Sequence, residues 1–244
     1  MIKPKLVLLH GWAVHSAIWH GIEDALSVHF DLHPIDLPGY GNRHTENGDL
    51  DLRALAKDVL ARAPARAHWL GWSLGSMVAM SAALSAAEQI ESLTLINPTP
   101  LFMQTESWPH GTALSALENL QSRFQSDYAT ALKRFLLLQA GTDQVARANA
   151  KTTWQRLTEG PPPTTATLDA GLEILKKTDM RQSVPAIDVP THIITCAEDR
   201  VIPAAAGKQL HHLIPNSVLL ELNCGHAPMI EVPSALVEAV RSSV

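Results

Sequence analysis

The sequence has little of several features that mark specialised classes of protein. Only two of its 244 residues are cysteines, too few for a disulfide scaffold, and neither lies in a CxxC or other metal-ligand spacing. Charged residues make up 18%, and 19 Lys and Arg face 24 Asp and Glu. This net charge of −5 argues against a nucleic-acid-binding protein. Hydrophobic residues still make up 46%, which is typical of a globular protein with a sizeable core.

Signals for export or membrane insertion are also lacking. Only four apolar residues separate Lys5 from His10, too few for the core of a signal peptide. Residues 67–87 contain no Asp, Glu, Lys or Arg, but they include a histidine, two glycines and four serines. A strand, a tight turn and a buried helix explain this stretch better than a membrane span. We therefore expect a cytoplasmic protein that binds neither membrane nor nucleic acid.

The apolar pattern predicts one α/β domain with a mostly parallel sheet. Short apolar runs, buried on both faces, alternate with longer segments of helical period. The expected strands are 6–9, 31–35, 67–71, 93–97, 192–196 and 217–222. The expected helices are 51–62, 76–87 and a last one from about Pro233.

Residues 101–188 break this alternation. Their sequence pattern predicts helices at 112–126, 128–139, 143–157 and 164–177. The glycine and prolines of residues 160–163 separate the last two helices. We expect residues 1–100 and 189–244 to form the core, with 101–188 inserted as an all-helical cap. A cap at this point would cover the carboxyl end of the sheet, where such sheets bind ligands.

The strongest catalytic motif is Gly71-Trp72-Ser73-Leu74-Gly75. It matches the nucleophile elbow GxSxG, in which a tight strand-to-helix turn exposes a serine hydroxyl. The motif lies between an expected strand and an expected helix, as the elbow requires. The alternative is an ordinary glycine-rich helix start.

A serine hydroxyl needs a base and an orienting carboxylate, which follow it in this fold in the order acid, then histidine. Asp199 and His226 have this order, and each follows the end of an expected strand. The adjacent Glu198 remains an alternative acid, because the order alone does not choose between neighbours.

His10-Gly11-Trp12 follows the first expected strand and matches the loop that completes an oxyanion hole. The donors would be the backbone amides of Trp12 and Leu74, and the His10 side chain would hold the loop; the alternative is a simple turn. The other histidine spacings, including His15, His20 and the pair His211-His212, do not suit a metal site. We expect no metal and no organic cofactor.

With these residues in place, the chain resembles the α/β-hydrolases, and more narrowly the pimeloyl-[acyl-carrier protein] methyl ester esterase family of biotin synthesis (the BioH family). Many α/β-hydrolases share the elbow and the HGW string. The strings RFLLLQ and GLEILK in the expected cap are not shared so widely, and they are what points to this one family. The matching strings are LVLLHGW at 6–12, DLPGYG at 36–41, WLGWSLG at 69–75, RFLLLQ at 134–139, GLEILK at 171–176 and GHAP at 225–228.

The resemblance implies a serine carboxylesterase with the triad Ser73, Asp199 and His226. The implied substrate contacts are Trp12, Ser73, Leu74, Phe135, Leu136, Leu137, Leu138, Gln139 and His226. The sequence departs from the family at Ser76, where a second glycine is usual, and in its short start, which curtails the opening edge hairpin. Two other enzyme functions remain open, because the fold supports many activities: a broad short-chain carboxylesterase and a carbon–carbon bond hydrolase. A catalytically inactive ligand-binding protein also remains open.

The resemblance also implies that the cap meets an acidic acyl-carrier protein. We expect a monomer, although the sequence itself does not fix the oligomeric state. Residues 123–156 hold six basic and two acidic residues, a local charge of +4. The candidate docking residues are Lys133, Arg134, Arg147 and Lys151, and the last two are spaced to share one helix face. Without the resemblance, a solvated helix face explains the same charges. Whether Cys196 and Cys224 approach one another is left open.

Overall fold

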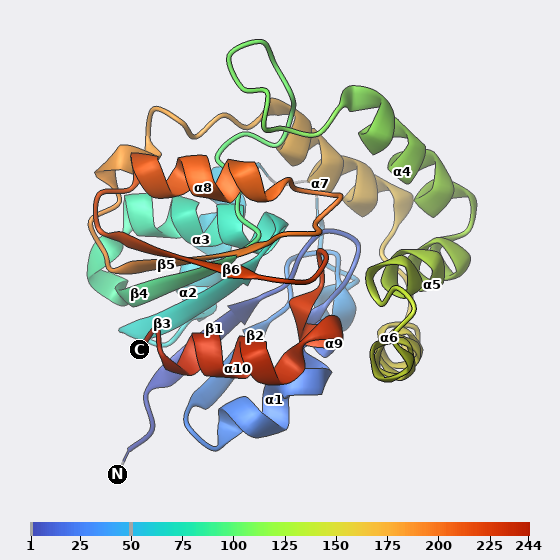
Figure 1. The fold of residues 1–244 in the computed structure, drawn as a ribbon, viewed down its shortest axis with the longest axis horizontal. Helices are drawn as coiled ribbons and strands as arrows, with labels where there is room; N and C mark the ends of the chain where they lie inside the picture. Colours follow the sequence, from blue (N-terminus) through green and yellow to red (C-terminus); the bar gives the residue numbers. More distant parts are fainter. Residues whose placement is uncertain (1, 49–50) are drawn as a thin grey trace.

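The computed structural model describes residues 2–48 and 51–244 and confirms the predicted α/β fold with a parallel sheet (Figure 1). Within these residues the sheet has six strands in the order β2-β1-β3-β4-β5-β6, and every pairing is parallel. The strands are β1 (Lys5–Leu9), β2 (Asp31–Ile35), β3 (Ala67–Trp72), β4 (Ile90–Ile96), β5 (Thr191–Cys196) and β6 (Ser217–Leu222). All six expected strands are present. Strand β4 begins three residues earlier than expected, because Ile90 pairs with Ala67 beside a register irregularity.

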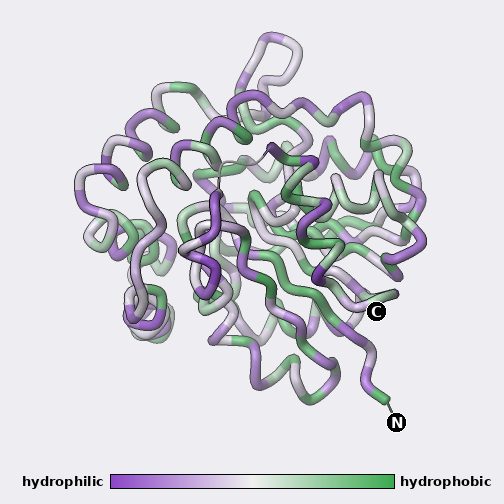
Figure 2. The backbone as a smooth tube through the Cα atoms, turned by 180° about the vertical axis from the view of Figure 1, so that it is seen from behind, coloured by the Kyte–Doolittle hydropathy of each residue, from purple (hydrophilic) through white to green (hydrophobic). Residues whose placement is uncertain are grey.

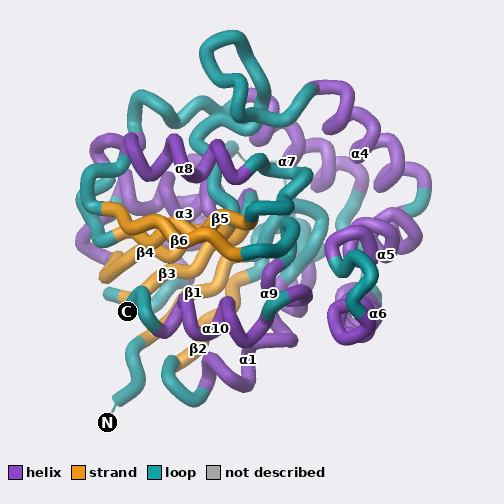
Figure 3. The backbone as a smooth tube through the Cα atoms, viewed as in Figure 1, coloured by secondary structure: helices purple, strands orange, loops and turns teal. Residues whose placement is uncertain are grey.

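Helices cover both faces of the sheet, and Figure 3 separates them from the strands by colour. Helices α1 and α10 pack together on one face, whereas α3 and α8 lie on the other and α2 packs against α3. Their bounds are α1 (His20–Ser27), α2 (Leu52–Arg62), α3 (Leu74–Ser85), α8 (Ala204–Leu213), α9 (Pro228–Glu231) and α10 (Pro233–Arg241). Short 3-10 helices occupy Ser16–Trp19, Gly41–Arg43, Ala87–Gln89 and Val184–Ala186. The apolar pattern does not reveal α1, α8 and α9, which are short.

The core lies between these layers and around the central strands. The four side chains of residues 6–9, all leucine or valine, are fully buried. Most side chains of β3 and β4 are buried as well. Figure 2 shows hydrophobic stretches along the central strands and hydrophilic stretches along the outer turns and helices. No helix within the described ranges is long and apolar enough to cross a membrane.

Residues 101–188, which we call the helical segment, join β4 to β5. Their α-helices are α4 (Leu114–Ser126), α5 (Tyr128–Gln139), α6 (Gln144–Leu157) and α7 (Thr165–Lys177), and α4, α5 and α6 stand on the right in Figure 1. Three of them begin where the side chain of Asp127, Asp143 or Thr164 accepts a hydrogen bond from a backbone amide of the first turn. Trp12, just beyond β1, donates from Nε1 to the Leu168 carbonyl of α7 at 2.9 Å. The segment therefore contacts the loop that follows β1 at the carboxyl end of the sheet.

The fully buried His10 side chain joins the loop after β1 to the loop after β2. The Leu37 amide donates to His10 Nε2 at 2.9 Å, and Nδ1 lies 2.8 Å from the Gly11 carbonyl oxygen. Because an amide only donates, Nε2 must accept, and we assign the ring proton to Nδ1 from this network. Burial lowers the pKa of His10 to about 4, although the nearby Asp36 carboxylate acts in the opposite direction. His10 is therefore a neutral structural group.

This burial predicts a loss of stability in mild acid. The unfolded chain takes up a proton at His10 near pH 6.5, whereas the folded protein resists protonation until about pH 4. The His10 contribution should thus lower the free energy of unfolding as the pH falls through this window, by about 3 kcal/mol at pH 4. Urea unfolding of the native protein and of His10→Gln at several pH values measures it. The native curve should fall more steeply than that of the variant, and two parallel curves would exclude this role for His10.

Candidate active site

Ser73 lies at a strained turn between β3 and α3. Its backbone has φ 55° and ψ −118°, a conformation that side-chain-bearing residues rarely adopt outside functional turns. A Cβ atom on Gly71 would lie 2.6 Å from the Gly75 carbonyl oxygen, and one on Gly75 would lie 2.3 Å from the Leu9 carbonyl oxygen. Both flanking positions therefore require glycine. This is the strand-turn-helix setting that the GxSxG motif predicts.

Ser76, the departure from the family's second glycine, adds hydrogen bonds to this turn. Its fully buried hydroxyl lies 2.7 Å from the Gly71 carbonyl oxygen and 3.1 Å from that of Ile96. The first bond links the first turn of α3 back to the end of β3. The extra hydroxyl thus ties the helix to the strand across the elbow.

Asp199 and His226 meet beyond the ends of the paired strands β5 and β6. His226 Nδ1 donates to Asp199 Oδ2 at 2.6 Å, and both side chains are almost fully buried. Asp199 Oδ1 accepts from the amides of Val201 and Ile202, so its carboxylate is held at both oxygens. The neighbouring Glu198 side chain is exposed. The structure thus brings Asp199, and not Glu198, to the imidazole.

The main chain of His226 is held by two residues that the sequence analysis did not single out. The His226 carbonyl oxygen accepts from Trp72 Nε1 at 2.8 Å and from Asn97 Nδ2 at 3.0 Å. Asn97 directly follows β4 and has a positive φ of 47°. In the sequence, the features that could have pointed to these two residues were the position of Trp72 inside the elbow and the position of Asn97 at the end of a strand.

Ser73 and His226 line the same cavity, which is otherwise almost entirely apolar. Its volume is about 30 Å³, enough for a small group rather than a long chain. It is lined by Trp12, Ala13, Val14, Trp72, Ser73, Phe102, Leu117, Leu120, Phe124, Leu132, Phe135, Leu175, Val201 and His226. Within the described residues no hydrogen bond joins the Ser73 hydroxyl to His226, a bond that often tightens only when substrate binds.

A larger cavity of about 400 Å³ adjoins the first and shares five lining residues with it. The shared residues are Phe102, Leu117, Leu120, Phe135 and Val201. Polar and charged side chains, including Gln139, Glu198, Arg200 and Glu231, line the rest of this larger cavity. The two cavities therefore form a cleft with an apolar inner end at Ser73 and a polar outer part.

The loop after β1 passes close to the candidate nucleophile. A Cβ atom on Gly11 would lie 2.9 Å from the Trp72 ring and 3.3 Å from Ser73 Cβ. The Trp12 ring packs edge-on to Phe124, with centroids 4.9 Å apart. In the part of the chain that the structure describes, the amides of Trp12 and Leu74 make no hydrogen bond. Both are thus available to bind a developing oxyanion.

The five candidate substrate contacts on α5 are placed differently from one another. Phe135 lines both cavities, with its ring centroid 6.2 Å from that of His226, whereas Leu138 and Gln139 line the larger one. Leu136 is fully buried and Leu137 packs against the core, and neither is among the lining residues of these two cavities. Gln139 Oε1 accepts a hydrogen bond from the His226 amide at 2.9 Å.

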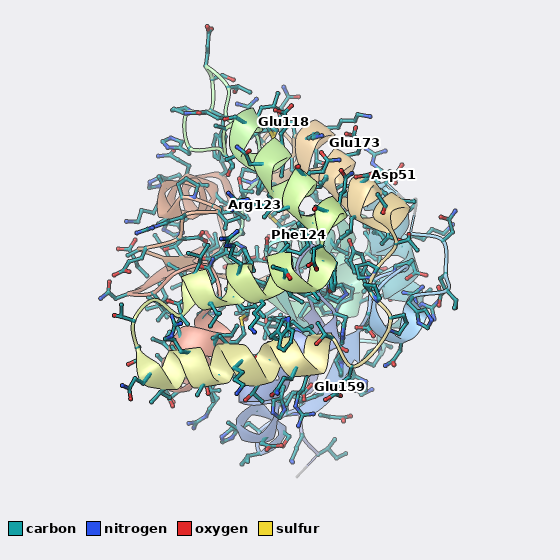
Figure 4. The ribbon with its side chains drawn as sticks, turned by 90° about the vertical axis from the view of Figure 1, so that its right-hand side faces the viewer. Asp51, Glu118, Arg123, Phe124, Glu159 and Glu173 are labelled. Atoms are coloured by element: carbon teal, nitrogen blue, oxygen red, sulfur yellow. The ribbon has the colours of Figure 1, made fainter. Side chains whose placement is uncertain are left out.

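The four candidate docking residues are exposed on two helices that pack together. Lys133 and Arg134 lie on α5, and Arg147 and Lys151 lie one turn apart on α6, the two helices that lie one above the other in the lower half of Figure 4. The Lys133 ammonium lies 4.8 Å from the centre of the Trp154 ring, and Arg147 donates to the Gly141 carbonyl at 3.0 Å. Arg123, labelled in Figure 4, adds a further cation on α4.

Cys196 and Cys224, whose separation the sequence left open, lie in contact near the acid and histidine loops. Both are buried free thiols, and their sulfur atoms are 3.4 Å apart. The hydrogen bond with Cys224, together with burial, raises the pKa of the Cys196 thiol, as expected of an unreactive packed pair. Among the described residues no group of three His, Cys, Asp or Glu side chains is arranged to hold a metal ion.

Comparisons with known proteins agree with this geometry. The model of the alpha/beta hydrolase family matches residues 6–239. A pimeloyl-[acyl-carrier protein] methyl ester esterase from Nitrosomonas europaea is 38% identical over 96% of this chain and 93% of its own length. One from Aeromonas salmonicida is 37% identical over 98% and 94%.

Among solved structures, similarity extends over nearly the whole fold. An esterase from Exiguobacterium antarcticum superposes with a TM-score of 0.86 at 21% identity, covering 99% of this chain and 91% of that one. An enol-lactonase from Burkholderia xenovorans gives 0.83 at 22% identity, covering 100% and 92%. At these identities the structures show a shared fold only. Together with the family match and the curated relatives, they establish that the chain belongs to the alpha/beta hydrolase family.

Proposed function

We propose that the protein is a serine carboxylesterase that hydrolyses the methyl ester of pimeloyl-[acyl-carrier protein] during biotin synthesis in the cytoplasm. The observation that carries the proposal is the joint placement of Ser73 and the Asp199–His226 pair around one apolar cavity. The curated relatives, matched over nearly their full length, support this substrate. In this proposal residues 101–188 act as a cap over a core formed by residues 1–100 and 189–244.

The first half of the reaction transfers the acyl group to the enzyme. Ser73 Oγ attacks the ester carbonyl carbon while His226 Nε2 takes the hydroxyl proton, and Asp199 stabilises the resulting imidazolium. The carbonyl oxygen becomes an oxyanion that the amides of Trp12 and Leu74 bind. When the tetrahedral intermediate collapses, His226 gives its proton to the departing methoxide, and methanol leaves.

Water completes the second half. His226 removes a proton from a water molecule that attacks the acyl-enzyme carbonyl, and then returns that proton to Ser73 Oγ as the C–O bond breaks. The product is a free carboxylic acid, which ionises at neutral pH. The inner cavity is lined by no lysine or arginine, so its walls suit a neutral ester better than the carboxylate product.

The division of the cleft fits an acyl chain attached to a carrier. Only a small group fits in the inner cavity beside Ser73, so the rest of the acyl chain and its attachment must extend into the larger, more polar cavity. A broad short-chain esterase would need no acyl-carrier arm in the outer cavity. The two activities therefore differ in how much they depend on the outer cavity and the charged helices beside it.

The nucleophile is tested by covalent labelling. A fluorophosphonate should add mass to the peptide that contains Ser73, because the elbow exposes its hydroxyl beside a base. The variant Ser73→Ala should lose both labelling and several orders of magnitude in kcat, since triad members act as a unit. Labelling of the alanine variant at full yield would refute the assignment. Rescue of a biotin-requiring strain that lacks its own esterase tests the substrate separately.

The identity of the carboxylate that orients His226 is tested by comparing variants of the adjacent residues Asp199 and Glu198. Asp199→Asn should lower kcat by about 10⁴-fold, because the amide favours the wrong tautomer of His226. Glu198→Gln should have little effect, since Glu198 is exposed and Asp199 holds the imidazole at 2.6 Å. Assays of both variants on p-nitrophenyl acetate measure this, and the opposite ranking would make Glu198 the acid.

We further propose that α5 and α6 dock the acidic acyl-carrier protein through Lys133, Arg134, Arg147 and Lys151. Their exposure and their common location on two packed helices support this proposal. Surface charges of this kind mainly steer encounter between partners and are screened by salt.

Reversing two of these charges should therefore affect only the carrier-bound substrate. Arg147→Glu with Lys151→Glu should lower kcat/KM on the carrier-bound methyl ester about tenfold at low salt, and less at high salt. Hydrolysis of a small p-nitrophenyl ester should be nearly unchanged. The matched control is Arg53→Glu with Lys57→Glu, an exposed pair with the same spacing on α2. Equal losses of kcat/KM on both substrates would indicate a damaged cap. No loss on either substrate would indicate that these charges only face solvent and do not dock the carrier protein.

A further inference from the structure

The loop that carries His226 receives two side-chain hydrogen bonds at consecutive backbone amides. Glu231 Oε2, from α9, accepts from the Gly225 amide at 2.8 Å, and Gln139 Oε1, from the end of α5, accepts from the His226 amide at 2.9 Å. A Cβ atom on Gly225 would lie 2.9 Å from the Gln139 oxygen and 3.0 Å from Glu231 Oε1. Glycine at position 225 therefore leaves room for both acceptors.

The two ends of the His226 peptide unit are held by different parts of the molecule. The carbonyl oxygen is bound by Trp72 and Asn97, which belong to the ends of β3 and β4. The amide is bound by Gln139, which belongs to the helical segment. The imidazole is bound by Asp199, beyond β5. The position of the ring thus depends on α5 as well as on the sheet.

We propose that Gln139 is a positioning residue for His226, in addition to any contact that it makes with substrate. The inference rests on the proposed function, because it assumes that His226 is the base. The His226 residue is only 2% exposed, so its amide would have no ready replacement for this acceptor. Loss of the bond would let the loop shift, and a shift of about 1 Å at a reacting group costs up to about 100-fold in rate.

The proposal separates two roles that the same residue could have. A residue that only contacts the acyl-carrier arm would change KM for the carrier-bound ester and leave small esters unaffected. A residue that positions the base would lower kcat for every ester, including one that lacks the acyl-carrier arm. The choice of substrate therefore distinguishes the two roles.

The test compares Gln139→Met with Gln139→Glu on p-nitrophenyl acetate and on the carrier-bound methyl ester. Methionine has a similar length but no oxygen acceptor, whereas glutamate keeps one. We expect Gln139→Met to lower kcat about tenfold on both substrates, with KM for the small ester unchanged. Gln139→Glu should retain kcat on the small ester to within about threefold. Gln155→Met, the same change at an exposed position on α6, is the matched control and should have no effect.

A second measurement uses the rate at which a fluorophosphonate labels Ser73, which requires an active base but no substrate arm. This rate should fall in Gln139→Met in parallel with kcat and recover in Gln139→Glu. Gln139→Asn, whose shorter side chain cannot reach the amide, should repeat the methionine result if the methionine variant folds poorly. Thermal unfolding of each variant establishes that the folded protein is compared.

Unchanged kcat and labelling in Gln139→Met, with a raised KM on the carrier-bound ester alone, would overturn the proposal and leave Gln139 as a substrate contact. Equal losses in the methionine and glutamate variants would also overturn it, since the retained acceptor would then not matter. Failure of the proposed function is distinguishable, because it would show as absent labelling of Ser73 in the native protein.

Discussion

The first turn of α3 lies directly against the carboxyl end of β1, and the whole candidate site depends on this approach. The backbone at Gly75 is so close to the Leu9 carbonyl that a single added carbon would lie 2.3 Å from it. The same turn carries Ser73 and the Leu74 amide, while the strand continues into Gly11 and Trp12. The proposed nucleophile and oxyanion donors are therefore held together by backbone packing, which tolerates little motion because protein interiors are densely packed.

The proposed base, His226, is held in a different way, by residues from four elements other than its own. Parallel strands end at the same edge of the sheet, so Asp199 after β5 and His226 after β6 emerge as neighbours. Trp72 and Asn97 reach the same loop from β3 and β4, and Gln139 reaches it from α5. Because His226 is buried and its amide has Gln139 as its acceptor, loss of that side chain leaves a buried donor without a partner. The carbonyl oxygen, bound by both Trp72 and Asn97, keeps one donor if the other is removed.

The parts of the site that depend on local patterns could be predicted from the sequence, whereas those that depend on three-dimensional contacts could not. The strand runs and the GxSxG turn are local, so the sheet and the position of Ser73 followed from them. Chain order could not separate Asp199 from Glu198, because only the loop geometry decides which side chain is buried. Trp72 is only a variable position of the GxSxG motif, and Asn97 and Glu231 belong to no motif. The resemblance names Leu136 and Leu137 as substrate contacts, and in the structure Leu136 is fully buried and Leu137 is partly buried against the core.

The arrangement assigns chemistry to the sheet and selection of substrate to the helical segment. Among the described residues that line the inner cavity, His226 is the one titratable side chain, so in the proposed reaction charge develops where Asp199 and the two amides can stabilise it. The lining from α4, α5 and α7 is apolar, and in the proposed reaction it would contact the part of the substrate that does not react. Substitutions there can alter which acyl chain fits without moving the triad. Gln139 is the exception, since it belongs to the helical segment but bonds the catalytic loop, so changes in α5 reach the base as well as the cleft.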